Sequence, residues 1–468
     1  MIVRGDSVKT SSRDWRLWVL LGGYVIASLT YAIFIPWGGN PDEKAHYEYI
    51  QYLAEEHRLP VFKSNEVLYE AHQPPLYYLL SLPFYWLGGL LGTPKVIRLL
   101  AVLTGAGVLA CTYWTARRLY PKEEGAPLLA GAVAGFLPST LTMNASVGND
   151  SLATLVFSVF ALWCAGQWRG RIGARTGLGT GLLVGVAMMT KLTSLMLALL
   201  TVVAILLFAQ EDTARQEVAA AQKGERGKRE QARGPVVRQA HHPEQGRRAG
   251  KAGSSVRPQE GHRPWLAVGL AAGTALVICG WWVVRNQIIY GEPFVVRSYA
   301  ERFSPTQSSE FFLSRGASGA SYMLLVVVHT FWTFWGSFGQ AQIFMPTWVY
   351  MSWLGVSGAI VGGWVVRARR KREREAGEAG MRLARLILLL EIGLLLAFLL
   401  RLNVVLFQAQ ARYLLIGATP IAIFMAVGLL TVFPERWRKR TAVLVSGVFF
   451  AYGMLALLVW GLPGYAGR

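Results

Sequence analysis

Two adjacent carboxylates and a histidine stand at the start of a loop, just beyond the first long apolar run of the chain. Asp42 and Glu43 follow Asn40-Pro41, and His46 comes four residues after Asp42, so a helix would place Asp42 and His46 on one face. Ionisable side chains at the edge of a membrane are costly and are usually functional. Because a carboxylate within reach of a hydroxyl can act as a general base, Asp42 and Glu43 are the candidate catalytic residues.

Besides the two candidate catalytic acids, seven polar residues are expected on the same side of the membrane. They lie in the first outer loop or at the ends of other apolar runs. Cations beyond a reaction centre would stabilise a departing phosphate, where negative charge develops in the transition state. Carboxylates and cations together suit the transfer of a sugar from a lipid phosphate to a hydroxyl acceptor. The candidate substrate-binding residues are His46, Gln73, Asn149, Asp150, Lys191, Arg285 and Arg412.

Each candidate also has a purely structural explanation. Asn40, Pro41 and Glu43 form the pattern of a helix start, in which Glu43 is a capping-box carboxylate, so Asp42 is the sharper catalytic candidate. The structural alternatives for the others are an interfacial helix face at His46, a rigid helix start at Gln73-Pro74-Pro75, a favourable helix dipole at Asp150, and membrane-boundary positions at Lys191, Arg285 and Arg412.

The composition places these residues in a membrane protein. The 468 residues are 53% hydrophobic and have a mean hydropathy of +0.35, which is too apolar for a soluble protein of this length. The apolar residues come in blocks that can each cross the roughly 30 Å hydrocarbon core of a bilayer, and a spanning backbone of this kind must be helical. We therefore predict an all-α polytopic membrane protein with about 11 transmembrane helices and additional interfacial helices in the outer loops.

The predicted spans follow the apolar blocks. Two other apolar runs, 76–91 and 322–338, are interpreted as interfacial or re-entrant helices, because counting 76–91 as a span would put Arg117 and Arg118 outside. The spans cover about 17–36, 97–116, 125–142, 151–168, 176–190, 192–209, 265–284, 348–366, 383–400, 412–433 and 441–460.

The formal net charge of +20 first suggests a nucleic-acid partner, but the basic residues are distributed by loop. Most of the 47 Lys and Arg fall on alternate connections, which the positive-inside rule assigns to the cytoplasm. This pattern predicts no nucleic-acid partner, membrane lipids as neighbours, a cytoplasmic N-terminus, and a multi-pass protein of the cytoplasmic membrane with Asp42 on the outer face. Cys111, Cys164 and Cys279 lie inside apolar runs and are expected to be small core residues.

The predicted spans and their orientation divide the chain into three parts. Residues 1–209 form an N-terminal membrane half, with the catalytic first outer loop at 37–95. Residues 210–264 are rich in Gln, Arg, Gly, Ala and Glu and are predicted to be a disordered, basic cytoplasmic loop. Residues 265–468 form a C-terminal membrane half with an outer loop at 285–346.

Several of these motifs resemble the membrane glycosyltransferases of the C superfamily. The nearest resemblance is to the protein-mannosyltransferase-like and rhizobial core-oligosaccharide-transferase-like families, of the family 39 type. The motifs that carry it are Asp42-Glu43-x-x-His46-Tyr47, Gln73-Pro74-Pro75-Leu76-Tyr77-Tyr78, Asn149-Asp150 and Thr190-Lys191-Leu192-Thr193; Trp281-Trp282-x-x-Arg285-Asn286 and Gln410-Ala411-Arg412-Tyr413-Leu414-Leu415 are similar to an uncharacterised bacterial branch.

The resemblance implies a polyprenyl-phosphate sugar as donor, an active site outside the cytoplasmic membrane, and a first-loop acid as base, which by position is Asp42 or Glu43. It implies that a hexosyl or pentosyl group passes, with inversion, to a glycan, lipid or protein acceptor. Asn149-Asp150 aligns with a motif that binds a divalent metal in some relatives, and the lone acid here leaves magnesium or manganese open at Asp150.

The competing interpretation is a transporter or flippase for a polar lipid or glycolipid. Such proteins also place charges in a membrane cavity, and they tend to show repeated halves and broken helices near the midplane. The sequence shows no fixed-period repeat, and its charges gather at one face. Glycosyl transfer is therefore favoured.

Overall fold

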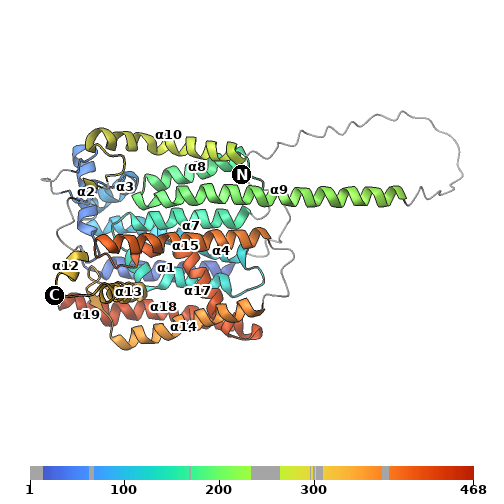
Figure 1. The fold of residues 1–468 in the computed structure, drawn as a ribbon. Coiled ribbons are helices and arrows are strands. Elements are labelled where there is room, and N and C mark those ends of the chain that lie inside the picture. The colour runs from blue at the N-terminus through green and yellow to red at the C-terminus, as the bar shows by residue number, and fades with distance from the viewer. Residues whose placement is uncertain are drawn as a thin grey trace.

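A computed structural model gives the fold of residues 14–62, 68–167, 170–232, 264–295, 297–298, 301, 309–370 and 379–467. The described part is a bundle of long helices with one two-stranded hairpin (Figure 1). In the hairpin, Ser337 pairs with Phe344 and Phe338 pairs with Ile343.

The first half of the bundle contains α1 (Trp15–Phe34), α2 (Glu43–Glu56), α3 (Leu76–Leu90), η1 (Pro94–Ile97), α4 (Arg98–Leu119), α5 (Ala126–Phe136), α6 (Pro138–Met143), α7 (Asp150–Gly166), α8 (Ala174–Met188), η3 (Leu192–Ser194) and α9 (Leu195–Ala232). The second half contains α10 (Pro264–Tyr290), α12 (Ser309–Leu313), α13 (Gly319–Trp335), β1 (Ser337–Phe338), β2 (Ile343–Phe344), α14 (Thr347–Arg370), α15 (Ala379–Val405), α16 (Arg412–Leu415), α17 (Ala418–Val432), α18 (Glu435–Leu455), η5 (Ala456–Gly461) and α19 (Leu462–Ala466).

The multi-pass membrane architecture is confirmed. By length and composition, seven of the described helices can cross a membrane: Trp15–Phe34, Pro94–Leu119, Leu192–Gln222, Pro264–Tyr290, Thr347–Arg369, Ala379–Val405 and Glu435–Ala466. Shorter apolar helices lie at Ala126–Phe136, Asp150–Gly166, Gly319–Trp335 and Ala418–Val432.

All eleven predicted spans coincide with helices, but in four of them the helices have fewer than 18 residues. The span predicted at 125–142 is divided into α5 and α6, because Pro138 has no N–H to continue the helix before it. The other three short ones are α7, α8 and α17, with 17, 15 and 15 residues. The runs at 76–91 and 322–338 form α3 and α13, which have 15 and 17 residues.

Helix α9 corrects the prediction of a disordered loop at 210–264. The helix continues through Ala232 and projects beyond the bundle (Figure 1). Its extension is rich in Ala, Gln, Glu and Arg, which are good helix formers, and Arg215 lies 4.0 Å from Glu211 in an i,i+4 pair. The same polar composition thus forms a helix without burying a core, and residues 233–263 of the predicted loop lie outside the described residues.

The two ends of the bundle differ in character. Helix α4 begins at Arg98, at the end covered by α2 and α3, and it ends at Leu119, at the opposite end (Figure 1). Near Leu119, the carboxylate of Glu123 accepts hydrogen bonds from Arg367 at 2.8 Å and from Arg438 at 3.0 Å. Basic segments that were predicted to share one side therefore meet at the end away from Asp42.

Helices α14 and α17 cross closely at two glycines. A Cβ atom added at Gly363 would collide with the carbonyl oxygen of Gly428, whereas one added at Gly362 would meet nothing within 4 Å. We expect Gly363→Ala to push the helices apart and cost about 1–3 kcal/mol, as overpacking typically does. Thermal unfolding in detergent should show a lower melting temperature for Gly363→Ala and an unchanged one for Gly362→Ala. Equal melting temperatures for the two variants would contradict this crossing.

Candidate active site

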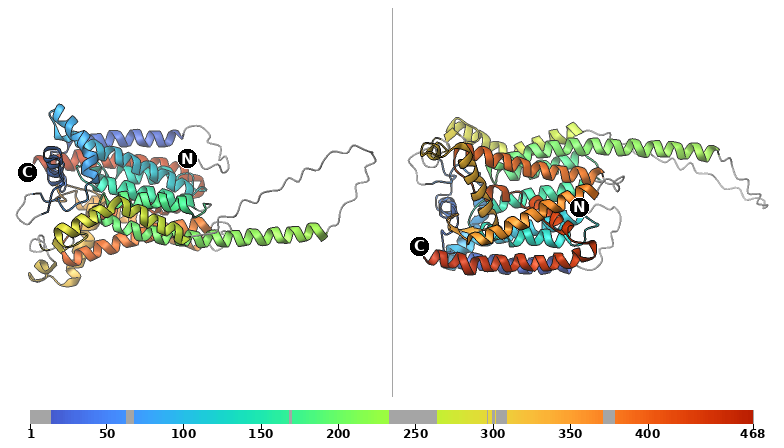
Figure 2. Two further views of the ribbon diagram at one scale, coloured as in Figure 1. Left: turned by 90° about the horizontal axis from the view of Figure 1, so that it is seen from above. Right: turned by 60° about the horizontal axis from the view of Figure 1, so that its bottom comes forward.

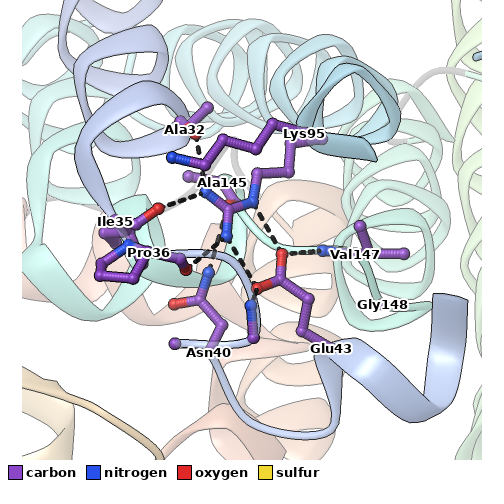
Figure 3. A network of polar contacts seen from close by, with 12 residues as sticks. Ala32, Ile35, Pro36, Asn40, Glu43, Lys95, Ala145, Val147 and Gly148 are labelled. Atoms are coloured by element: carbon purple, nitrogen blue, oxygen red, sulfur yellow. Dashed lines mark hydrogen bonds and ion pairs between the residues drawn. The ribbon is translucent and has the colours of Figure 1, made fainter. Parts of the chain in front are cut away.

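Glu43 (Figure 3) is the first residue of α2, and it is buried beside Arg98, the first residue of α4. Arg98 donates hydrogen bonds to the two carboxylate oxygens at 2.7 and 2.8 Å, and both side chains are fully buried. The backbone N–H groups of Gly38 and Val147 donate to the same carboxylate at 3.0 and 3.2 Å. The remaining donors of Arg98 reach the carbonyl oxygens of Ala32, Ile35 and Pro36.

This network joins the end of α1, the starts of α2 and α4, and the loop before α7. Asn40 adds a hydrogen bond to the carbonyl oxygen of Ala145 at 3.2 Å (Figure 3). The prediction that Glu43 caps its helix is wrong, because its carboxylate accepts hydrogen bonds from Arg98, a residue distant in sequence. Four donors occupy the Glu43 carboxylate, so its geometry suits a structural role, whereas the adjacent Asp42 lies outside this network.

Asp42 has an unusual backbone conformation at the start of α2. Its φ of 57° lies in the left-handed region, which is uncommon for residues other than glycine. Its carboxylate lies 2.7 Å from the guanidinium of Arg412, and its side chain is 32% exposed. Burial acts to raise the pKa of Asp42, but the Arg412 guanidinium outweighs burial and holds the pKa below its ordinary value. Asp42 is therefore ionised at neutral pH.

A cavity with an empty volume of about 650 Å³ lies beside this pair. One part of its wall carries charged or titratable groups, and the rest carries hydroxyl and amide groups. The polar lining residues are His46, Ser139, Thr142, Ser146, Asp150, Thr333, Ser337, Gln410 and Arg412.

His46 lies in the wall of this cavity and is nearly fully buried. Its Nδ1 atom is 2.9 Å from the hydroxyl oxygen of Tyr78. Burial lowers the pKa of His46, although Glu70 and Asp42 act in the opposite direction. His46 is therefore a buried, neutral imidazole at neutral pH.

Glu70 is an acid that the sequence reasoning missed. It is buried, its Oε2 atom has no hydrogen-bond partner within the described residues, and burial raises its pKa above the ordinary value. The nearby carboxylate of Asp42 also raises the pKa of Glu70, whereas the cations Lys191 and Arg412 lower it. Nothing in the local sequence around Glu70 distinguished it from the exposed acids of the same loop.

Asp150 and Lys191 form an ion pair at the cavity, with each side chain 11% exposed. Asp150, at the start of α7, lines the cavity, and Lys191 lies just before η3. A divalent metal does not fit these residues, because the Asp150 carboxylate is occupied by an ammonium group. Within the part of the chain that the structure describes, no group of three His, Cys, Asp or Glu side chains could hold a metal ion.

Gln73 and Asn149 do not line the cavity. The side-chain amide of Asn149 donates to Gln73 Oε1 and to the carbonyl oxygen of Thr190, both at 3.1 Å. The N–H of Leu76 donates to the carbonyl oxygen of Met189 at 3.0 Å. These contacts hold the first loop against α7 and α8.

Arg285 also lies apart from the cavity. It donates to the carbonyl oxygen of Pro60 at 2.7 Å and stacks on Trp282 with 4.7 Å between its guanidinium carbon and the ring centroid. The structure thus brings together five of the nine predicted site residues, and it uses the other four to hold the loop. The five are Asp42, His46, Asp150, Lys191 and Arg412; the four are Glu43, Gln73, Asn149 and Arg285.

Replacing Glu43 should test the structural role of the buried pair. Glu43→Gln leaves the fully buried guanidinium of Arg98 without a counter-charge, and breaking such a pair typically costs about 3–5 kcal/mol. We expect a marked loss of folded protein and a lower melting temperature in detergent.

The matched control is Glu124→Gln, which removes an ion pair of similar length, 2.9 Å to Lys439, on the exposed surface. Exposed pairs contribute little, so this variant should melt like the wild type. A Glu43→Gln protein as stable as the control would show that the buried network does not hold the loop.

Comparisons with known proteins concern both the sequence and the fold. Residues 72–220, from within the first outer loop into α9, match the profile of glycosyltransferase family 87. No curated protein matches the chain.

Among solved structures, the fold is similar to that of ArnT from Cupriavidus metallidurans bound to undecaprenyl phosphate. The identity is 14%, the match covers 97% of this chain and 74% of ArnT, and the TM-score is 0.53. The oligosaccharyltransferase of Archaeoglobus fulgidus in complex with zinc and sulfate matches at 12% identity and a TM-score of 0.47, over 93% of this chain and 52% of its own length. The fold of this chain is thus similar to that of ArnT.

Proposed function

We propose that this chain is a membrane glycosyltransferase that moves a sugar from a polyprenyl-phosphate donor to a hydroxyl acceptor in the cavity beside Asp42. The family 87 match and the likeness in fold to ArnT support the reaction class. The observation that carries the proposal is the contact of Asp42 with Arg412, which lines the cavity, together with the pair of Lys191 and the cavity-lining Asp150. This arrangement supplies a base for the acceptor and cations for a phosphate.

Asp42 is the proposed general base. The acceptor oxygen attacks the anomeric carbon of the donor sugar while the bond from that carbon to the phosphate oxygen breaks, and the phosphate keeps the electron pair. The acceptor proton passes to the Asp42 carboxylate. Attack from the face opposite the phosphate inverts the anomeric configuration.

Arg412 has two proposed partners. It pairs with Asp42 at 2.7 Å, and its Nε atom has no hydrogen-bond partner within the described residues. A donor phosphate would compete with Asp42 for the guanidinium, because arginine binds phosphate through the same donors. Asp42 would then lose the cation that lowers its pKa and become a stronger base when the donor is present.

The remaining cavity wall suits the sugar. Five hydroxyl side chains and one amide line it, and such groups donate to and accept from sugar hydroxyls. Three of the hydroxyls already donate to backbone carbonyl oxygens: Thr142 to that of Pro138, Ser139 to that of Phe334, and Thr333 to that of His329. They can still accept hydrogen bonds from a ligand.

The reaction is proposed to take place at the outer face of the cytoplasmic membrane. The basic residues around Glu123 lie at the end of the bundle opposite Asp42, which agrees with a cytoplasmic location for that end. The acceptor would be a glycan, a lipid or a protein with an accessible hydroxyl.

Asp42→Asn tests the base directly. The substitution keeps the shape of the side chain and removes its ability to accept a proton, so transfer should fall by about 10²–10⁴-fold while the melting temperature stays close to that of the wild type. The assay supplies labelled polyprenyl-phosphate sugars to protein in nanodiscs and detects the new glycosidic product and the released lipid phosphate.

The control for this variant is Glu56→Gln, an exposed acid of the same helix. It should transfer at the wild-type rate. Wild-type transfer by Asp42→Asn would overturn the assignment of Asp42, and movement of the intact donor across the bilayer without a glycosidic product would favour a transporter.

The pH dependence of kcat/KM tests the link between Arg412 and Asp42. A base is active when ionised, so activity is lost on the acid side as pH falls through the pKa of Asp42. Arg412 lowers that pKa, and Arg412→Gln should therefore move the acid limb to higher pH in addition to slowing the reaction. Arg438→Gln, at the opposite end of the bundle, should leave the limb in place. An acid limb that does not move in Arg412→Gln would contradict the proposed coupling.

A further inference from the structure

An apolar groove runs along the flank of the bundle, away from the candidate site. Its lining residues come from α1, α5 and α18, which pack against one another. The blue α1 and the red α18 lie side by side in Figure 2. Its empty volume is about 1010 Å³, and its wall includes Val19, Gly23, Phe136, Val443 and Phe450. A groove of this size and lining fits a hydrocarbon chain.

The length of the groove matches one leaflet of a bilayer. From Lys439 to Phe450, α18 rises about 16 Å at 1.5 Å per residue. Half of the hydrocarbon core of a bilayer is about 15 Å thick. The groove can therefore hold one acyl chain between the membrane surface and the midplane.

The mouth of the groove is positively charged. Arg16 and Lys439 both line it, and the only carboxylate paired with Lys439 among the described residues is that of Glu124, at 2.9 Å on the exposed surface. This mouth lies at the basic end of the bundle, close to the helix starts at Trp15 and Glu435. Two cations and one carboxylate leave a net positive charge at the mouth. This charge attracts an anionic head group, which the cytoplasmic leaflet supplies.

Ser446 gives a second, independent indication of a ligand. Its hydroxyl is buried, lines the groove, and has no hydrogen-bond partner within the described residues. A buried hydroxyl without a partner is unfavourable. The ester carbonyl of a glycerolipid accepts a hydrogen bond from such a group, whereas a bare hydrocarbon does not.

We propose that this groove binds an anionic diacyl phospholipid. The phosphate contacts Arg16 and Lys439, and one acyl chain lies along α18 toward Phe450. This site is separate from the cavity beside Asp42, and its occupancy does not depend on glycosyl transfer.

Lipid binding can be measured by native mass spectrometry on the full chain after delipidation and incubation with equal amounts of phosphatidylglycerol and phosphatidylcholine. The wild type should retain phosphatidylglycerol in preference to phosphatidylcholine. The double variant Arg16→Gln, Lys439→Gln should reduce that preference by about thirtyfold, given the usual contribution of two basic residues near a membrane surface.

A second variant closes the groove without changing charge. Gly447 lines the groove, and a Cβ atom added there meets nothing within 4 Å, so Gly447→Leu should fold and fill the space. It should lose the retained lipid. Gly280 on α10 also faces open space, outside the groove, so Gly280→Leu is the matched control and should bind lipid like the wild type.

Three results would overturn the proposal. They are equal retention of the two lipids by the wild type, unchanged preference in the double variant, and equal loss of lipid from Gly447→Leu and Gly280→Leu. Because the readout is lipid retention, none of these results depends on whether the chain transfers a sugar.

Discussion

The buried ion pair of Glu43 and Arg98 is the interaction on which the candidate site depends. Two charges without exposure to water are tolerable only when both are fully hydrogen-bonded, and here the carboxylate has four donors while the guanidinium also reaches three backbone carbonyls of the α1 end. The pair therefore fixes where α1 ends and where α2 and α4 begin. Because Glu43 is the first residue of α2, the pair also fixes the position of the residue that precedes it.

That neighbour is Asp42, and its geometry follows from the pair. With Glu43 held inward by Arg98, the chain turns through a left-handed conformation at Asp42 and the next carboxylate faces Arg412 instead. Two adjacent acids thus have different roles: one is buried and holds the loop, and the other is partly exposed and ionised beside a cavity. The division explains how a carboxylate in a connection between helices is held in a defined position beside the cavity.

The sequence predicted where the helices lie because a bilayer demands apolar length, and every predicted span coincides with helical residues. Of the predicted 11 transmembrane helices, however, seven described helices are long and apolar enough to cross a membrane. It also predicted that Asp42, Asp150 and Arg412 would meet, since loops on one side of a membrane are close in space. It could not assign Glu43, because the cap pattern is local while Arg98 lies far along the chain. It misjudged α9, because residues that avoid a core can be helical as well as disordered.

The central claim is that the cavity beside Asp42 binds a lipid-linked phosphate at Arg412. The most direct measurement is a cryo-electron microscopy structure of the protein in nanodiscs with a polyprenyl phosphate. The account predicts phosphate oxygens within hydrogen-bond distance of the Arg412 guanidinium and a separation between Asp42 and Arg412 longer than the present 2.7 Å. A phosphate bound elsewhere in the protein, with the contact between Asp42 and Arg412 intact, would contradict it.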